Sequence, residues 1–244
     1  MNFVFAFLIA FTFLLVTTFA QKPTDCSLVP PALWCQNDTL AEFCGLTDQC
    51  QRYEKAMEGK KLKMTLLYET LCPDSQAFVK QQLKDVHNNF VDYIDFEWVP
   101  FGNAHVENGT IVCQHGEPEC IANKFESCVI AHINDPFELI YCLEGKFECN
   151  KTLDDASEEC YKELKIETSV RHDIDQCFSG SEGQELQVKA AERTKNVWPQ
   201  QHRGVPYVLF NDIGVWNIQY AVYNISSGFV CSYLTGKKPK LCNF

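Results

Sequence analysis

The feature that most constrains this chain is a cysteine placed between an apolar run and a helical apolar pattern. Residues 61–68 form a short apolar run that is typical of a buried strand. Further along, apolar side chains repeat at about helical spacing, at Val79, Leu83, Val86 and Phe90. A helix is therefore expected to follow, and Cys72 stands where the strand ends and the helix begins. The positive end of a helix dipole at that point favours the thiolate form of a cysteine.

A thiolate in this position is suited to attack on disulfides. The order strand, Cys-x-x-Cys, helix is the redox layout of thioredoxin-like proteins. Here the motif reads Cys72-Pro73-Asp74-Ser75, with serine in place of the second cysteine. Ser75 forms no disulfide, so it cannot resolve a mixed disulfide as a second cysteine would. The carboxylate of Asp74 is expected to disfavour the thiolate and to weaken the reactivity of Cys72 at acidic pH.

The beginning of the chain predicts entry into the secretory route. Residues 1–20 are almost wholly apolar, end in the small-residue pattern Thr18-x-Ala20 and read as a cleaved signal peptide. An uncleaved signal anchor is the alternative, because no Lys or Arg precedes the apolar stretch. No later stretch is long and apolar enough to span a bilayer. Four glycosylation sequons fit the same route, at Asn37, Asn108, Asn150 and Asn224.

Charge and cysteine content narrow the partners further. The net charge of −11 argues against nucleic acid or anionic membrane surfaces as partners. The 14 cysteines are expected to be mostly disulfides in an oxidising compartment. If Cys72 is free and the first four cysteines pair locally, the nine from Cys113 to Cys242 are an odd number. Then a second thiol is free, or two chains are cross-linked into a dimer, or Cys72 is itself disulfide-bonded.

The first four cysteines form a compact block. The segment is too short to build a hydrophobic core of its own, yet it holds four cysteines, Cys26, Cys35, Cys44 and Cys50. This predicts two local disulfides. With Pro30-Pro31 and Trp34, their spacing resembles a saposin A-type domain over residues 21–55. That resemblance implies a module for lysosomal sorting or precursor processing, and a generic disulfide-stapled knot is the alternative. Their spacing does not suit a zinc site.

The main domain is expected over residues 61–244. Residues 93–100 alternate like a strand and complete a parallel βαβ unit with the first strand and its helix. Residues 103–196 predict a disulfide-stapled, mainly helical insertion. Strand character returns at 205–210, followed by a turn and a partner strand at 215–218. Together these elements predict an α/β thioredoxin-like fold with a helical insertion, preceded by a small cysteine-rich module.

The most specific motif occupies residues 113–128. It reads Cys-Gln-His-Gly-x-x-Glu-Cys-x-x-Asn-x-x-x-x-Cys, with the fixed residues Cys113, Gln114, His115, Gly116, Glu119, Cys120, Asn123 and Cys128. It resembles the signature of the gamma-interferon-inducible lysosomal thiol reductase family. The resemblance covers roughly residues 61–242 and implies a thioredoxin-like fold that reduces disulfides of unfolded proteins in acidic endolysosomal compartments.

The chemistry of the signature residues suggests a structural role. The cysteines at 113, 120 and 128 are expected to form disulfides, while His115 and Asn123 hold the loop by hydrogen bonds. The alternative is a metal site with Cys113, His115 and Cys120 as ligands. We expect no metal there.

Val205-Pro206 is a second functional candidate. In thioredoxin-like folds a cis-proline precedes the strand opposite the active cysteine, and Pro206 stands just before a predicted strand. The free backbone of Val205 would there pair with an extended substrate chain. An ordinary trans proline that opens a strand is the alternative.

These features predict a thiol-disulfide oxidoreductase, secreted or lysosomal, that forms mixed disulfides through Cys72 alone. It would need no cofactor, and a small thiol such as glutathione or cysteine would recycle it. Its partners would be unfolded or disulfide-bonded proteins. The alternative is a catalytically silent secreted protein that binds extended polypeptides near Pro206, marked by a Cys72 that is buried or permanently paired.

Overall fold

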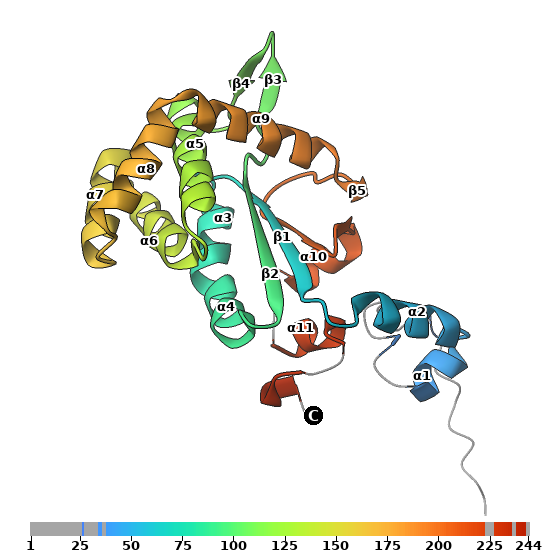
Figure 1. Ribbon diagram of the computed structural model, residues 1–244. Helices are drawn as coiled ribbons and strands as arrows, with labels where there is room; N and C mark the ends of the chain where they lie inside the picture. The colour runs from blue at the N-terminus through green and yellow to red at the C-terminus, as the bar shows by residue number, and fades with distance from the viewer. Residues whose placement is uncertain (1–25, 27–33, 36–37, 223–226, 236–237, 243–244) are drawn as a thin grey trace, which may run out of the picture.

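A five-stranded mixed sheet forms the centre of the computed structural model, which describes residues 26, 34–35, 38–222, 227–235 and 238–242 (Figure 1). The strand order is β2-β1-β6-β7-β5. The strands are β1 (Leu62–Tyr68), β2 (Ile94–Pro100), β5 (Trp198–Pro199), β6 (Tyr207–Phe210) and β7 (Ile213–Gly214). β1 runs parallel to β2 and antiparallel to β6. A parallel βαβ unit followed by antiparallel strands is the plan of a thioredoxin-like fold, as the sequence predicted.

The helix after β1 begins at the expected place. It starts with α3 (Pro73–Ala77), continues through the π-helical segment η3 (Phe78–Leu83) and ends with α4 (Lys84–Phe90). The apolar residues that predicted this helix are all buried, namely Val79, Leu83, Val86 and Phe90. Their burial explains why the segment packs as a crossover between the two parallel strands.

Helices α5 to α9 follow one another between β2 and β5 in the sequence. A hairpin of β3 (His105–Glu107) and β4 (Thr110–Val112) projects from the body before them (Figure 1). The helices are α5 (Glu117–His132), α6 (Phe137–Glu148), α7 (Leu153–Glu163), α8 (Thr168–Ser179) and α9 (Ser181–Lys195). The disulfide Cys128–Cys177 joins α5 to α8, and Cys142–Cys160 joins α6 to α7. The expected disulfide-stapled helical insertion is therefore present, with an unforeseen hairpin at its start.

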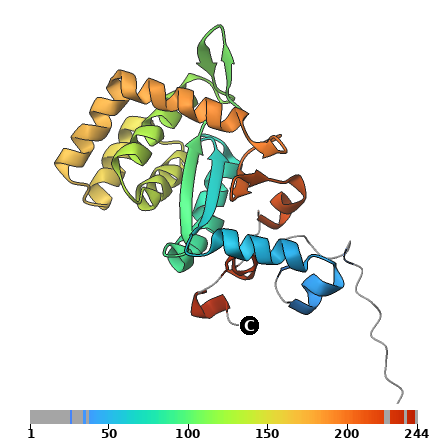
Figure 2. The same ribbon diagram turned by 45° about the vertical axis from the view of Figure 1, so that its right-hand side comes forward.

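The two faces of the sheet contribute to two apolar clusters. Met64, Leu66 and Tyr68 of β1 face the larger cluster, which includes residues of η3, α4, α5 and α6. Leu67, between them in sequence, faces a smaller cluster to which α9 contributes Ala190. This alternation follows the period of a strand that is buried on both faces. Helix α9 also packs against β2 (Figure 2).

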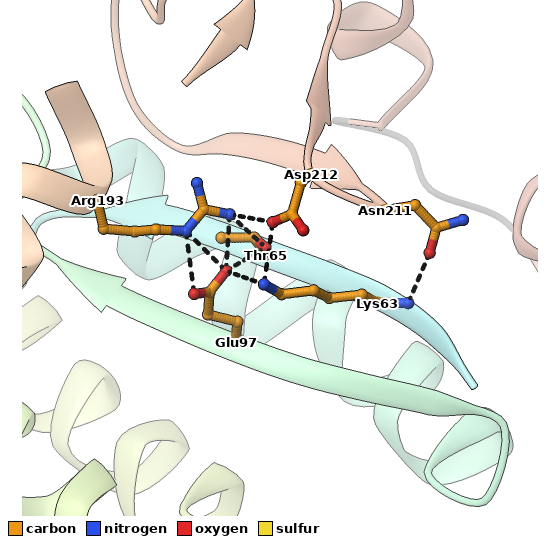
Figure 3. A network of polar contacts seen from close by, with 6 residues as sticks. All are labelled: Lys63, Thr65, Glu97, Arg193, Asn211 and Asp212. Carbon is orange, nitrogen blue, oxygen red and sulfur yellow. Dashed lines mark hydrogen bonds and ion pairs between the residues drawn. The ribbon is translucent and has the colours of Figure 1, made fainter. Parts of the chain in front are cut away.

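A polar network fastens α9 to the sheet on the face of the smaller cluster (Figure 3). Arg193 of α9 donates to both carboxylate oxygens of Glu97 on β2, at 3.0 Å from Nε to each. It also pairs with Asp212 beyond the end of β6, at 2.5 Å. Lys63 of β1 pairs with the same two carboxylates, at 3.2 Å and 2.9 Å. Burial raises the pKa of Glu97, but its bonds with Arg193 and Thr65 outweigh that effect and lower the pKa to about 2.

The cysteine-rich module contains α1 (Asp38–Phe43) and α2 (Thr47–Met57). Its two predicted local disulfides are present, as Cys26–Cys44 and Cys35–Cys50. Helix α2 begins at Thr47, within the block, and ends at Met57. Tyr53 of α2 donates to the carbonyl of Tyr233, 3.0 Å away, so the module is hydrogen-bonded to the main body.

The end of the chain contains α11 (Ser227–Tyr233) and the 3-10 helix η4 (Lys240–Cys242), joined by Cys231–Cys242. The predicted signal peptide at 1–20 and the sequons at Asn37 and Asn224 lie outside the described residues. Within the residues that are described, no helix combines the length and apolar character needed to cross a membrane.

The strand predicted at 215–218 is wrong. β7 ends at Gly214, and helix α10 (Trp216–Val222) begins at Trp216. β7 pairs with β6 at one position, Phe210 with Ile213. Gln219 of α10 explains the difference, because its side chain accepts from Val208 N at 2.9 Å and donates to Val208 O at 2.8 Å. The buried amide thus supplies the two hydrogen bonds that a longer partner strand would have made.

Candidate active site

Cys72 lies at the start of α3, where the sequence placed it. Its thiol makes no disulfide, and the residue is only 7% exposed. Its Sγ lies 3.8 Å from the carbonyl oxygen of Val205. The Val205-Pro206 peptide bond is cis, as expected. The structure therefore brings together the two sequence-predicted sites, although they are far apart in the chain.

The other residues of the motif differ in their surroundings. Pro73 and Asp74 are exposed in the first turn of α3, whereas Ser75 is fully buried. The hydroxyl of Ser75 accepts a hydrogen bond from the backbone N–H of Glu69, at 3.4 Å. The carbonyl of Glu69 accepts from the N–H of Cys72, at 3.3 Å. Ser75 is thus part of the turn that holds Cys72.

Residues of the 113–128 signature hold the same turn from the other side. Asn123 Oδ1 accepts from both the backbone N–H and the hydroxyl of Thr70, at 3.1 Å and 3.0 Å. His115 Nδ1 lies 2.5 Å from Glu119 Oε2, and its backbone N–H donates to Glu119 Oε1 at 3.0 Å. Both His115 and Asn123 therefore make hydrogen bonds of the kind expected from the sequence.

The signature cysteines are structural. Cys113 pairs with Cys120, and Cys128 pairs with Cys177. The alternative metal site with Cys113, His115 and Cys120 is therefore wrong, because a disulfide leaves no thiolate to bind a metal.

Two more signature residues help to shape the loop. Gly116 precedes α5 with φ of +84°, a conformation that favours glycine. The side chain of Gln114 accepts from the amide of Asn103 at an exposed position.

The odd cysteine is also identified. Among the cysteines from 113 to 242, Cys149 is unpaired and exposed. Of the three alternatives that the sequence left open, a second free thiol is the one present in this single chain. It lies next to the predicted sequon Asn150, which is exposed with φ of +57°, and Asn108 is likewise exposed at the tip of the β3–β4 hairpin.

Buried glutamates near the motif were missed from the sequence. Glu126 and Glu144 are fully buried, and the hydroxyl of Tyr68 donates to Glu126 Oε2 at 2.6 Å. Burial raises the pKa of Glu126 to about 8. Burial, then Glu126 and Cys72, raise the pKa of Glu144 well above its ordinary value. Glu126 lies on the apolar face of α5 and Glu144 on the apolar face of α6. A charged residue at an apolar position of a helical pattern was the signal that could have revealed them.

Comparisons with known proteins identify the family that the chain resembles. The family model described as "Gamma interferon inducible lysosomal thiol reductase (GILT)" matches residues 63–164. A gamma-interferon-inducible lysosomal thiol reductase from Carassius auratus is 30% identical over 218 residues, covering 87% of this chain and 83% of the relative. A gamma-interferon-responsive lysosomal thiol protein from Arabidopsis thaliana is 32% identical over 199 residues, covering 77% of this chain and 78% of the relative. Among solved structures, DsbA from Chlamydia trachomatis is similar with a TM-score of 0.44 and 16% identity, over 67% of this chain and 85% of that one.

Proposed function

The chain belongs to the gamma-interferon-inducible lysosomal thiol reductase family, and we propose that it catalyses thiol-disulfide exchange on protein disulfides through Cys72 alone. The observation that carries this proposal is the unpaired thiol of Cys72 at the start of a helix, 3.8 Å from the carbonyl of Val205. The helix dipole favours the thiolate, and the Val205 backbone offers hydrogen-bonding groups beside it.

The first step is attack by the Cys72 thiolate on one sulfur of a substrate disulfide. A bond forms between Cys72 Sγ and that sulfur while the substrate S–S bond breaks, and the second substrate sulfur leaves as a thiolate that takes a proton. An extended substrate segment would pair with the backbone of Val205 during this step. The product is a mixed disulfide between Cys72 and the substrate.

Release requires a thiol from outside the motif, because the hydroxyl of Ser75 forms no disulfide. A small thiol such as glutathione or cysteine attacks the substrate sulfur of the mixed disulfide, and the Cys72 thiolate leaves. A second small thiol then frees the substrate sulfur as a thiol and is itself oxidised to the small disulfide. If a thiol of the same substrate attacks instead, the outcome is isomerisation.

The proposal extends to the location of the protein in the cell. The predicted signal peptide and sequons favour the secretory route, and the family name favours a lysosomal destination. The saposin A-type-like block over residues 21–55 would serve sorting or processing. Its two disulfides suit an oxidising compartment.

One observation favours a second candidate function. Cys72 is only 7% exposed, and a buried cysteine is the mark of a protein that binds extended polypeptides near Pro206 without turnover. On that reading the Val205 backbone would still pair with a polypeptide, but the thiol would not exchange.

The two functions are separated by turnover of a denatured disulfide-bonded protein in the presence of glutathione. We expect wild type to be active and Cys72→Ser to be inactive. Ser75→Cys places a second sulfur three residues after the first, so it should release substrate without glutathione. A Cys72→Ser variant as active as wild type would exclude the proposed mechanism. Failure of wild type to form a mixed disulfide at Cys72, mapped by mass spectrometry, would favour the silent protein.

A further inference from the structure

Three potential metal ligands converge behind the turn that carries Cys72. Glu69, His115 and Glu119 each present one ligand atom, and these three atoms lie within 4.8 Å of one another. His115 Nδ1 is 2.5 Å from Glu119 Oε2 and 3.5 Å from Glu69 Oε2. Glu69 comes from the end of β1, while the other two come from the signature at the start of α5.

Each carboxylate is oriented by a backbone donor. Glu69 Oε1 accepts from the N–H of Asn103, and Glu119 Oε1 accepts from the N–H of His115. The second oxygen of each carboxylate is thereby turned toward the imidazole of His115. Outer contacts that fix one oxygen and aim the other are the usual support of metal ligands.

The cluster is short of positive charge. Both glutamates are fully buried, and Glu69 Oε2 accepts no hydrogen bond from any residue that the structure describes. Within the same part of the chain, neither carboxylate forms an ion pair with a Lys or Arg. Burying carboxylates without compensation is costly.

The backbone is also shaped to admit the Glu69 side chain. Gly102 has φ of +56°, and a Cβ at that position would overlap Cγ of Glu69. His115 remains 32% exposed at its side chain, which leaves the cluster open to solvent on one side.

We propose that Glu69, His115 and Glu119 form a binding site for one divalent cation of the zinc class. Two carboxylate oxygens and one imidazole nitrogen are a ligand set that suits Zn²⁺. Two carboxylates and a neutral imidazole balance the charge of a divalent ion. The exposed side leaves a position for water as a fourth ligand. This site goes beyond thiol-disulfide exchange and does not require it.

The test is isothermal titration calorimetry of the full chain with Zn²⁺ near pH 7. Free thiolates also bind zinc, so the titration uses the double variant Cys72→Ser with Cys149→Ser. We expect one Zn²⁺ per chain. Adding Glu69→Gln, Glu119→Gln or His115→Gln should weaken binding by at least about tenfold. Mg²⁺, which prefers octahedral oxygen ligands, should not compete.

His132→Gln is the matched control. His132 lies in a second cluster with Cys177 and Glu182, but Cys177 is held in its disulfide with Cys128. The control should therefore bind Zn²⁺ like the double variant. Absence of binding in the double variant would overturn the proposal, as would binding that survives the three ligand substitutions. Circular dichroism identifies any variant that fails to fold, and His115→Gln, at the partly exposed position, keeps the test decisive if a buried glutamate variant unfolds.

Discussion

At the scale of single residues, the turn that presents Cys72 is held by side chains from distant segments. Asn123 Oδ1 accepts hydrogen bonds from the backbone N–H and the hydroxyl of Thr70. Gln76 Nε2 donates to the carbonyl of Thr70 at 2.9 Å. All three residues are buried, so water is a poor substitute for these bonds. The position of the thiol therefore depends on residues that never touch it.

Asn123→Ala should destabilise the fold by about 2 kcal/mol, because it leaves the buried N–H of Thr70 without a partner. Gln114→Ala is the control, since Gln114 belongs to the same signature but is exposed and should cost less than about 0.5 kcal/mol. Urea unfolding measures both. Equal losses would contradict the role assigned to Asn123.

Gly102→Ala should be more damaging than Gly59→Ala. Both glycines have positive φ, +56° and +69°, so an alanine is strained at each by about 1 kcal/mol. Only Gly102 faces a neighbour, because its Cβ would overlap the Glu69 side chain while nothing lies within 4 Å at Gly59. We expect an additional loss of about 2 kcal/mol at Gly102 in urea unfolding. A similar loss at the two positions would show that Glu69 moves aside freely.

The sequence revealed the residues of the site better than their pairing. The signature and the Cys72 motif were evident, and so was the expected cis-proline. Residue types alone could not predict that Cys149 is the unpaired cysteine. The odd number of cysteines from Cys113 to Cys242 shows that one lacks a partner within that set, but not which one. Nor could they predict that Glu69 turns toward His115, since that contact joins segments 46 residues apart in the chain, from 69 to 115.

At the scale of elements, the spacing of apolar residues predicted the strands and helix that pack at the centre of the sheet. β1, β2 and the helix between them follow apolar patterns that burial explains. The strand predicted at 215–218 did not form, because the side chain of Gln219 in α10 makes hydrogen bonds with the backbone N–H and carbonyl of Val208. A side chain that replaces a strand is a tertiary contact, which local sequence does not encode.

The attachment of α9 to the sheet predicts the effect of Arg193→Met. This change removes the bidentate contact with Glu97 and leaves that half-buried carboxylate with Lys63 and Thr65. We expect a loss of about 2 kcal/mol in the free energy of unfolding, measured by urea unfolding. Arg193→Lys keeps the charge but loses the fork, so its loss should be intermediate.

Lys63→Met provides the comparison for this network. Lys63 is one-third exposed at its side chain, and its ion pairs should contribute no more than about 1 kcal/mol. A loss for Lys63→Met that matches or exceeds the loss for Arg193→Met would show that Arg193 is not the main link between α9 and the sheet.

At the scale of the whole molecule, buried acids of opposite behaviour set the pH of greatest stability. Glu126 has its pKa raised by burial from 4.5 to about 8, and Glu144 is raised in the same direction. The folded chain therefore binds these protons more tightly than the unfolded chain. Their contribution is fully present below about pH 4.5 and is lost as the pH rises toward 8.

Glu97 acts in the opposite sense. Its pKa is lowered from 4.5 to about 2, so the stability that it contributes is present above about pH 4.5 and is lost as the pH falls toward 2. From these two effects we expect the stability to be greatest near pH 5, between the two pH ranges. That pH suits the acidic compartment in which we propose that the protein acts.

Thermal unfolding should therefore show a higher Tm at pH 5 than at pH 8, with a difference in unfolding free energy on the order of 2 kcal/mol. Glu144→Gln keeps the shape of the side chain and removes one of the titrating groups, so it should flatten this dependence. Glu138→Gln is the matched control, because Glu138 lies on the same helix but is exposed, and it should leave the slope unchanged. A Tm that rises from pH 5 to pH 8 in wild type would mean that the buried carboxyls are charged in the folded protein. In that case some positive group or bound cation would have to lie beside them.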